Sequence, residues 1–287
     1  MSTRTEYGES LREAAIGLAE KLSTLLVFVL AGVFLVPLGL LLVTSVKSKN
    51  EIFANPLALP EQIQFRNYMN AWTTGGFDQY FMNSVIVVGI SLVCILILSS
   101  LAAYALVQFD FPASNFMLVF FLAGFMIPPQ VLLVPLYTIM NALNLLNTYY
   151  SLIFAYIAFG LPFSVFLLRQ FFVTIPDTYA EAARMDGCNE FQVFYRIYLP
   201  LSLPALAAVA IYQFVFLWNE FLYAIIFITD DAKRTLPAGL MAFQGQYAGD
   251  WAQLAAGIVI AVTPTVIFFL IFQRQFMRGI SMGATKG

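Results

Sequence analysis

Six long apolar runs decide the environment in which this chain folds. They cover approximately residues 22–46, 83–107, 116–140, 149–168, 201–228 and 254–272. Each is long enough to cross the hydrocarbon core of a bilayer as a helix, which takes about 20 apolar residues. Hydrophobic residues make up 61% of the chain and charged residues only 10%, unlike a soluble protein. The sequence therefore predicts an all-α integral membrane protein with six transmembrane helices.

Polar segments divide the chain into three parts. Residues 1–22 carry charges of both signs with apolar residues at helical spacing, which predicts an amphipathic cytoplasmic segment. Residues 23–273 form the six-helix transmembrane domain, and residues 274–287 form a cytoplasmic tail. Because six spans bring both termini to the same side, the basic residues decide which side that is.

The basic residues favour cytoplasmic termini, since the predicted inner segments hold nine of them and the outer segments five. The inner ones are Arg4, Arg12, Lys21, Arg169, Arg184, Arg196, Arg274, Arg278 and Lys286, and the outer ones are Lys47, Lys49, Arg66, Lys233 and Arg234. Lys47 and Lys49 lie against the trend, close to the first span. This orientation places residues 169–200 in the cytoplasm, where ATP is available.

The longest polar interruption of the second half, residues 169–200, has the chemistry of two short helices with a break between them. Pro176 suits a first helical turn because its missing amide donor is not needed there. Residues 179–186 are compatible with a helix, and Gly187 follows where a left-handed C-terminal cap belongs. Asn189 is then a candidate N-cap for the second helix.

Two features of the first predicted helix suit contact with another protein. Ala182 and Ala183 leave its surface low, so that a groove of a partner can approach the backbone closely. Glu181 and Arg184, three residues apart, can form an ion pair across one turn.

The spacing in this interruption resembles the signature loop of permease subunits of bacterial and archaeal ABC importers. The pattern is Glu-Ala-Ala, three residues, Gly, nine residues, Ile, one residue and Leu-Pro. It is met without a gap by Glu181, Ala182, Ala183, Gly187, Ile197, Leu199 and Pro200, with Asp186 before the glycine. Further segments resemble the carbohydrate-uptake class, and within it the six-helix subunit of maltose-type importers. These are Asn83-Ser84, Ile127-Pro128-Pro129, Trp218-Asn219-Glu220-Phe221 and Gly283–Gly287.

The resemblance implies a type I ABC-importer permease fold and a hetero-oligomeric assembly. The implied partners are a second permease subunit, two ATP-binding subunits on the cytoplasmic side, an extracytoplasmic solute-binding protein, a sugar substrate and membrane lipid. In that family a coupling helix, here within residues 177–188, sits in a cleft of the ATPase subunit and transmits its motion. The tail from Ser281 to Gly287 resembles an extension that contacts the ATPase dimer. The implied location is a bacterial or archaeal cytoplasmic membrane.

The sequence carries no set of residues for catalysis. There is no histidine, no Gly-x-x-x-x-Gly-Lys-Ser/Thr phosphate-binding loop and no Cys-x-x-Cys pair, and the aspartates fall in predicted loops or at interfaces. We therefore expect a non-enzymatic subunit without cofactor, metal site or nucleic-acid partner, with ATP hydrolysed by a separate chain. The alternative is an ion-coupled secondary carrier, which ATP-independent counterflow by the purified chain would support.

Glu220 is the carboxylate that falls clearly inside a predicted span, and such a group usually faces protein or water. With Trp218 and Asn219 it either binds a sugar through stacking and hydrogen bonds or packs against the partner permease and holds a gate. Tyr212, Gln213 and Asn83 are weaker candidates for the substrate path, since such residues also tie helices together. In the outer loop, Gln244, Gln246 and Tyr247 either reach into the solute-binding protein or form a solvated turn.

Overall fold

The computed structural model describes residues 2–109, 111–246 and 250–284, and within these ranges the regular elements are all helical. Four helices are long and apolar enough to cross a membrane, and the number rises to six if each of two bent helix pairs is one span. The four are Lys21–Ser45 within α1 (Ser2–Ser45), α4 (Phe77–Gln108), α7 (Tyr149–Phe172) and Trp251–Gln273 within α14 (Trp251–Ala284). The predicted all-α membrane fold is confirmed.

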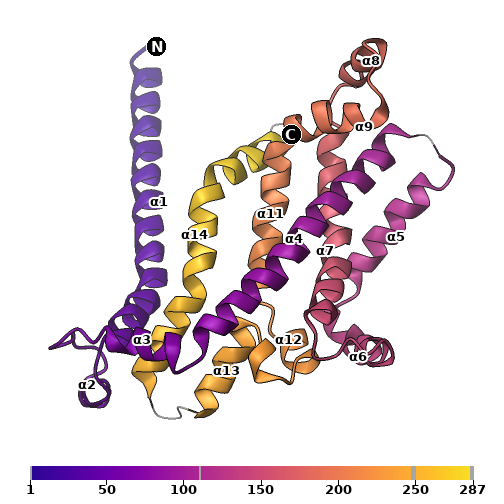
Figure 1. Ribbon diagram of the computed structural model, residues 1–287. Coiled ribbons are helices and arrows are strands. Elements are labelled where there is room, and N and C mark those ends of the chain that lie inside the picture. The colour runs from indigo at the N-terminus through magenta and orange to yellow at the C-terminus, as the bar shows by residue number, and fades with distance from the viewer. Residues whose placement is uncertain (1, 110, 247–249, 285–287) are drawn as a thin grey trace.

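The third apolar run forms the first bent pair. Helix α5 (Ser114–Met126) ends before two adjacent prolines, and a 3₁₀ turn, η1 (Pro129–Leu132), leads into α6 (Leu133–Ala142). The two parts meet at 89°. The predicted break at the prolines is confirmed. Its physical cause is that proline has no amide N–H to donate to the hydrogen bonds of a helix. The run is not one continuous helix, however, and α6 lies across the end of the bundle (Figure 1).

The fifth apolar run differs from the expected continuous span in two ways. It is entered through α9 (Glu190–Val193), a π-helical turn η2 (Phe194–Tyr198) and α10 (Leu199–Leu201), which meet α11 (Leu203–Trp218) at 75°. It is then interrupted at residues 219–221 before α12 (Leu222–Phe227). Glu220 therefore lies in a break between helices and not inside a helical span.

The short elements gather at the two ends of the helix bundle (Figure 1). One end carries α8 (Asp177–Met185) and α9, together with the start of α1 and the end of α14. The opposite end carries α2 (Lys49–Ala54), α3 (Arg66–Thr73), α6, α12, the 3₁₀ turn η3 (Asp231–Lys233) and α13 (Leu236–Gln246). We call these the α8 end and the α13 end.

The α13 end is more structured than the sequence predicts. The segment expected as an outer loop contains α13, and Leu236, Ala238 and Phe243 of that helix are buried. Lys47 is one of the basic residues on the predicted outer side, where the positive-inside rule does not favour them. It has no exposed surface and donates to the carbonyl oxygens of Asn55 and Pro56 at 3.1 and 2.9 Å. Its charge therefore lies inside a folded loop.

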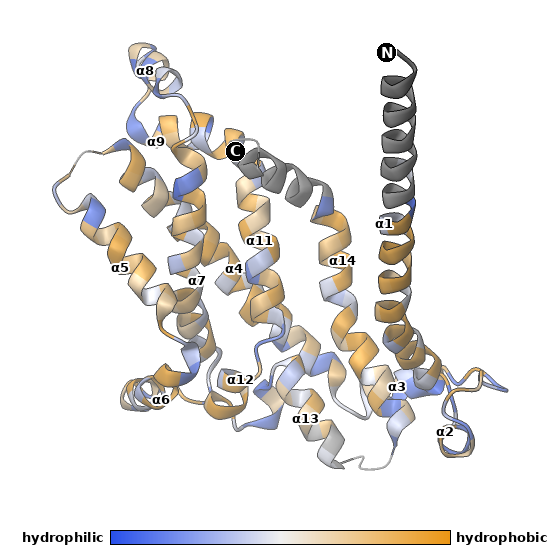
Figure 2. Cartoon of the chain, turned by 180° about the vertical axis from the view of Figure 1, so that it is seen from behind, coloured by the Kyte–Doolittle hydropathy of each residue, from blue (hydrophilic) through white to orange (hydrophobic). Residues whose placement is uncertain are grey.

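Buried side chains form two clusters, one toward each end. The larger joins α4, α7, α12 and α13, and the smaller joins the ends of α4 and α7 to α8, η2 and α11. The apolar stretch of α1 is quite different, because none of its most hydrophobic window is buried. In Figure 2 the apolar stretch of α1 is coloured as hydrophobic and lies beside α14. Such a surface requires lipid or another membrane helix around it.

Candidate functional site

Helix α8 is a short helix at one end of the bundle, and its C-terminal end is capped. Pro176 precedes it as the N-cap residue, one position before the predicted first turn, and Asp177 places a negative charge in that turn. Gly187 has φ +83°, which confirms the predicted left-handed cap. Its amide donates to Arg184 O at 3.0 Å and the amide of Cys188 donates to Ala183 O at 2.9 Å, the paired bonds of a Schellman motif.

The two faces of α8 have different roles. Ala180 and Ala183 point into the smaller cluster and are buried. Glu181 and Ala182 are exposed, and Met185 is 89% exposed. The expectation that both alanines lower the outer surface is therefore right for Ala182 and wrong for Ala183. Asp186 and Gly187 lie exposed at the end of the same helix.

Arg184 pairs with Glu190 of α9, so the expected pair with Glu181 is wrong. Its Nε and Nη2 donate to Glu190 Oε1 and Oε2 at 2.7 and 3.1 Å, and Nη2 also donates to Gln108 Oε1 at 2.8 Å. Tyr104 OH donates to Glu190 Oε2 at 2.8 Å, and Gln108 Nε2 donates to the hydroxyl of Tyr198. Sequence reasoning missed Tyr104, Gln108, Glu190 and Tyr198, although Gln108 was visible as the first polar residue after a span.

The second half of the signature pattern lies where the chain turns back into the bundle. Asn189 caps α9 through a capping box with Gln192, as predicted. Ile197 and Leu199 are half-buried against the smaller cluster, and Pro200 is exposed in the first positions of α10. The pattern residues therefore share one end of the molecule, with Glu181 and Ala182 facing outward.

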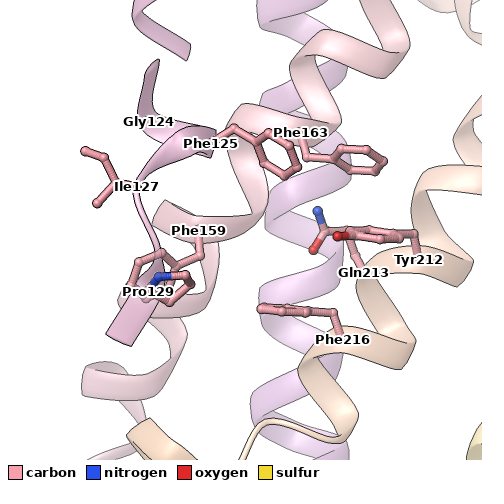
Figure 3. Close-up of a pocket in the computed structure, with 9 residues that line it drawn as sticks. All are labelled: Gly124, Phe125, Ile127, Pro129, Phe159, Phe163, Tyr212, Gln213 and Phe216. Atoms are coloured by element: carbon pink, nitrogen blue, oxygen red, sulfur yellow. The ribbon is translucent and has the colours of Figure 1, made fainter. Parts of the chain in front are cut away.

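A small chamber lies between α5, η1, α7 and α11 (Figure 3). Its volume is about 130 Å³, and it is lined by Gly124, Phe125, Ile127, Pro129, Phe159, Phe163, Tyr212, Gln213 and Phe216. Tyr212 stacks between Phe163 and Phe216, with ring centroids 4.2 and 6.5 Å apart. Gln213 is 1% exposed and its Nε2 donates to Gly160 O and Ser164 Oγ, both at 2.9 Å. Its Oε1 has no hydrogen-bond partner within the described part of the chain.

Trp218, Asn219 and Glu220 do not join this chamber. Glu220 Oε2 accepts from Tyr156 OH at 2.7 Å and from Ala224 N at 3.2 Å, and Oε1 accepts from Tyr223 N at 2.8 Å. These bonds place the carboxylate at the start of α12, where it receives the free amides of that helix.

The other two residues of this group face different surroundings. Trp218 is buried, donates to Ala261 O at 2.9 Å and lines a separate, open apolar groove of about 580 Å³. Asn219 is exposed, and its amide returns to Val215 O at 2.8 Å. The three side chains therefore face different surroundings and form no common site within the described part of the chain.

Asn83 and the candidate binding-protein residues lie at the α13 end. Asn83 is buried; its Nδ2 donates to Ala232 O and Arg234 O at 3.0 and 2.8 Å, and its Oδ1 accepts from Tyr149 OH at 2.8 Å. It therefore ties α4 and α7 to the segment before α13. Gln244 and Gln246 belong to α13, but the structure does not describe their side chains. Tyr247 lies outside the described residues. No group of three potential metal ligands occurs among the described residues.

Comparison with known proteins identifies the family of the chain. Residues 95–282 match the family described as "Binding-protein-dependent transport system inner membrane component". The chain is 44% identical over 251 residues to the probable ABC transporter permease protein YurM of Bacillus subtilis, covering 88% of this chain and 83% of YurM. It is 38% identical over 256 residues to the diacetylchitobiose uptake system permease protein NgcG of Streptomyces coelicolor, with coverages of 88% and 85%.

The fold has also been seen before. A chain of a bacterial ABC transporter involved in the import of the acidic polysaccharide alginate superposes with a TM-score of 0.76 at 23% identity, covering 90% of this chain and 98% of that one. At this identity the match supports the fold alone. Together with the family match and the identity to the two permeases, it shows that this chain belongs to the family of binding-protein-dependent transport system inner membrane components.

Proposed function

We propose that the chain is one permease subunit of an ATP-driven carbohydrate importer, with α8 as the segment that receives the motion of the ATPase. The named relatives support the substrate class. They include permeases for diacetylchitobiose, for arabinooligosaccharides, and for melibiose, raffinose and stachyose. The observation that carries the coupling role is the geometry of α8, a capped helix at the polar end with its Glu181 and Ala182 face uncovered.

The outer face of α8 is suited to binding a protein groove. Met185 and Tyr179 are 89% and 53% exposed, although they lie at the end of the bundle where polar residues predominate. A flexible methionine and an aromatic ring are side chains that protein interfaces favour. Glu181 and Asp186 beside them add negative charge for basic residues of a partner.

The aromatic chamber supports a contact with a sugar. Pyranose rings combine apolar faces with hydroxyl groups. The aromatic rings that line the chamber suit the apolar faces, and Gln213 Oε1, which has no partner among the described residues, is an acceptor for a hydroxyl group. A chamber of about 130 Å³ is too small for an oligosaccharide, and a second permease subunit would complete the path. Asn83 and Glu220 enter this proposal only as residues that hold the surrounding helices.

The remaining assembly follows from the same proposal. Two ATP-binding subunits would contact the α8 end in the cytoplasm, which places both termini on that side. An extracytoplasmic solute-binding protein would contact the α13 end, through Gln244, Gln246 and Tyr247. Helices α1 and α5 have large unburied apolar surfaces, which lipid and the second permease would cover.

Charge reversal on α8 tests the coupling role. In the importer purified with its native partners, we expect Glu181→Lys to leave membrane insertion and complex assembly intact while uptake falls at least tenfold. A suitable assay follows ATP-dependent uptake of a panel of labelled oligosaccharides, including diacetylchitobiose and raffinose, into proteoliposomes. Glu61→Lys, an exposed glutamate at the α13 end, is the matched control. Equal uptake by the two variants would count against the proposal.

A further inference from the structure

Helix α8 is held to the bundle by weak packing alone on its buried face. Its buried residues are Ala180 and Ala183, so no large side chain of this helix enters the smaller cluster. The segments on either side, residues 173–176 and 186–189, are short turns without helix. Two methyl groups bury little surface, and burial stabilises in proportion to area. Something else must fix how α8 is oriented.

Hydrogen bonds from side chains in the last turns of α4 fix the orientation of α8. Gln108 accepts from Arg184 of α8 at 2.8 Å and donates to Asp177 Oδ1 of α8 at 3.3 Å. Tyr104 donates to Glu190 at 2.8 Å, and Glu190 is the partner of Arg184. Since bonds to charged groups are about twice as strong as neutral ones, these few contacts can outweigh the alanine packing.

The same two α4 residues also hold the π-helical turn through which the chain returns to the bundle. Gln108 donates to the hydroxyl of Tyr198, which is fully buried. The ring of Tyr104 lies 5.0 Å from the ring of Tyr198 and 5.2 Å from that of Phe194. A π-helical turn is an irregular element that often marks a functional site. The entry to and the exit from the α8–α9 segment are therefore both tied to α4.

We propose that Tyr104 and Gln108, through Arg184, Glu190 and Tyr198, act as positioning residues that make α8 and α4 move together. We call these five residues the α4 brace. Without it, a displacement of α8 would be absorbed in the turns at residues 173–176 and 186–189. With it, the displacement is passed to α4. The inference rests on the proposed function, since it concerns how the motion received by α8 enters the membrane domain.

Helix α4 is suited to carry such a displacement across the membrane. It has 32 residues and no internal proline, which gives a length of about 48 Å. At its far end, Asn83 binds two carbonyls of residues 232–234, and Ser84 Oγ accepts from the amide of Leu236 at 2.7 Å. The brace at one end of α4 and these bonds at the other connect α8 with the start of α13.

The test uses variants that remove the polar atoms of the brace without removing a ring. Tyr104→Phe loses only the hydroxyl that reaches Glu190, and Gln108→Met keeps length while losing both polar atoms. Tyr195→Phe is the matched control, because the Tyr195 hydroxyl accepts from Arg196 on the exposed side of the same π-helical turn and touches no brace residue. Should Gln108→Met lower recovery of the complex, Tyr198→Phe with Tyr104→Phe provides the same test.

The measurement is a spin-label distance between α8 and α4 in the importer purified with its native partners in lipid nanodiscs. The labels are placed at Thr178→Cys and Leu101→Cys, both exposed positions, in a background of Cys94→Ala and Cys188→Ser. Distances are recorded without nucleotide and after trapping with ATP and vanadate. We expect the parent and Tyr195→Phe to keep one narrow distance in both states, and the brace variants to change or broaden it on trapping.

A functional readout accompanies the distance. Losing a hydrogen bond to a charged group should lower uptake per ATP hydrolysed by about tenfold in Tyr104→Phe/Gln108→Met. An unchanged distance and a normal uptake-to-hydrolysis ratio in the brace variants would overturn the inference. An absence of ATP-dependent uptake of any tested sugar by the parent would instead overturn the proposed function, so the two failures are distinguishable.

Discussion

The two ends of the helix bundle are held in opposite ways. At the α13 end, buried neutral side chains bind backbone carbonyls, as Asn83 does, and a fully buried lysine is enclosed by the loop it fills. At the α8 end, a half-exposed ion pair between Arg184 and Glu190 holds a helix whose buried side chains are two alanines. Buried polar bonds are costly to break, whereas exposed ion pairs contribute about 0–1 kcal/mol. The contrast indicates a fixed end, held by buried bonds, and an α8 end where the orientation of one helix depends on charged bonds at the surface between α8, α9 and α4.

The largest expected effect tests the fixed end. Asn83→Ala leaves Arg234 O and Tyr149 OH without the partner that Asn83 supplies, while Ala232 O keeps its bond from Gln79 Nε2 at 2.8 Å. We expect it to lower the free energy of unfolding by about 2–4 kcal/mol, since each buried unsatisfied group costs about 1–3 kcal/mol. Denaturation in detergent micelles, followed by tryptophan fluorescence, measures this.

Asn219→Ala is its control, because that exposed amide bonds only to the carbonyl four residues back in its own helix. We expect this variant to lower the free energy of unfolding by less than about 0.5 kcal/mol, the usual range for surface substitutions. Similar losses for the two asparagines would remove the distinction between the ends.

A glycine pair sharpens the contrast at the α8 end. Gly187→Ala puts a side chain at φ +83° without any steric contact, so the expected cost is the left-handed backbone strain of about 1–2 kcal/mol. Because this strain acts on the cap, it should appear as faster amide hydrogen exchange in α8, roughly tenfold, with little change elsewhere.

The same substitution at Gly89, in open space within α4, should have the opposite sign. A helical glycine replaced by alanine gains about 0.5–1 kcal/mol, so exchange in α4 should slow and exchange in α8 should stay unchanged. Two results would contradict a strain confined to the cap of α8: faster amide exchange in α8 for Gly89→Ala, or an unchanged exchange rate in α8 for Gly187→Ala.

The smallest effect concerns pH at the α13 end. Hydrogen bonds from Ser48, from its backbone amide and from the amide of Glu61 lower the pKa of Glu51 from 4.5 to about 2. A lowered folded-state pKa means that the carboxylate stabilises the loop fully above about pH 4.5, and that this contribution is lost as the pH falls through about 2. Carbon NMR of labelled glutamate should give a midpoint near 2, and Ser48→Ala should raise it. A midpoint unmoved by that variant would contradict the assignment.

The sequence predicted the four continuous membrane-crossing helices, because hydrophobicity over 20 residues needs no knowledge of neighbours, but it did not reveal that the fifth apolar run is bent and broken. It also predicted the cap at Gly187 and the break at Pro128 and Pro129, which depend on local backbone chemistry. The angle at that break depends on packing, including the bond from the Tyr223 hydroxyl to Pro129 O, and was not predictable.

The candidate site shows the same division. The accessibility of Ala182 was expected from its small side chain and from the resemblance to the signature loop, but the burial of Ala183 depends on the position of α4 and α7. Arg184 pairs with Glu190, six residues away, because the turn at Gly187 brings α9 beside α8. Glu220 was expected in a span, since hydropathy alone does not reveal that the helix ends at Trp218.

The most direct test of the account is a cross-link from the exposed face of α8. With Met185→Cys as the sole cysteine of the chain, in the background of Cys94→Ala and Cys188→Ser, a short bifunctional reagent is applied to the importer in native membranes. The account predicts a product with the ATP-binding subunit, and none from Leu57→Cys at the α13 end, which is also well exposed. A product between the ATP-binding subunit and Leu57→Cys, with none from Met185→Cys, would contradict it.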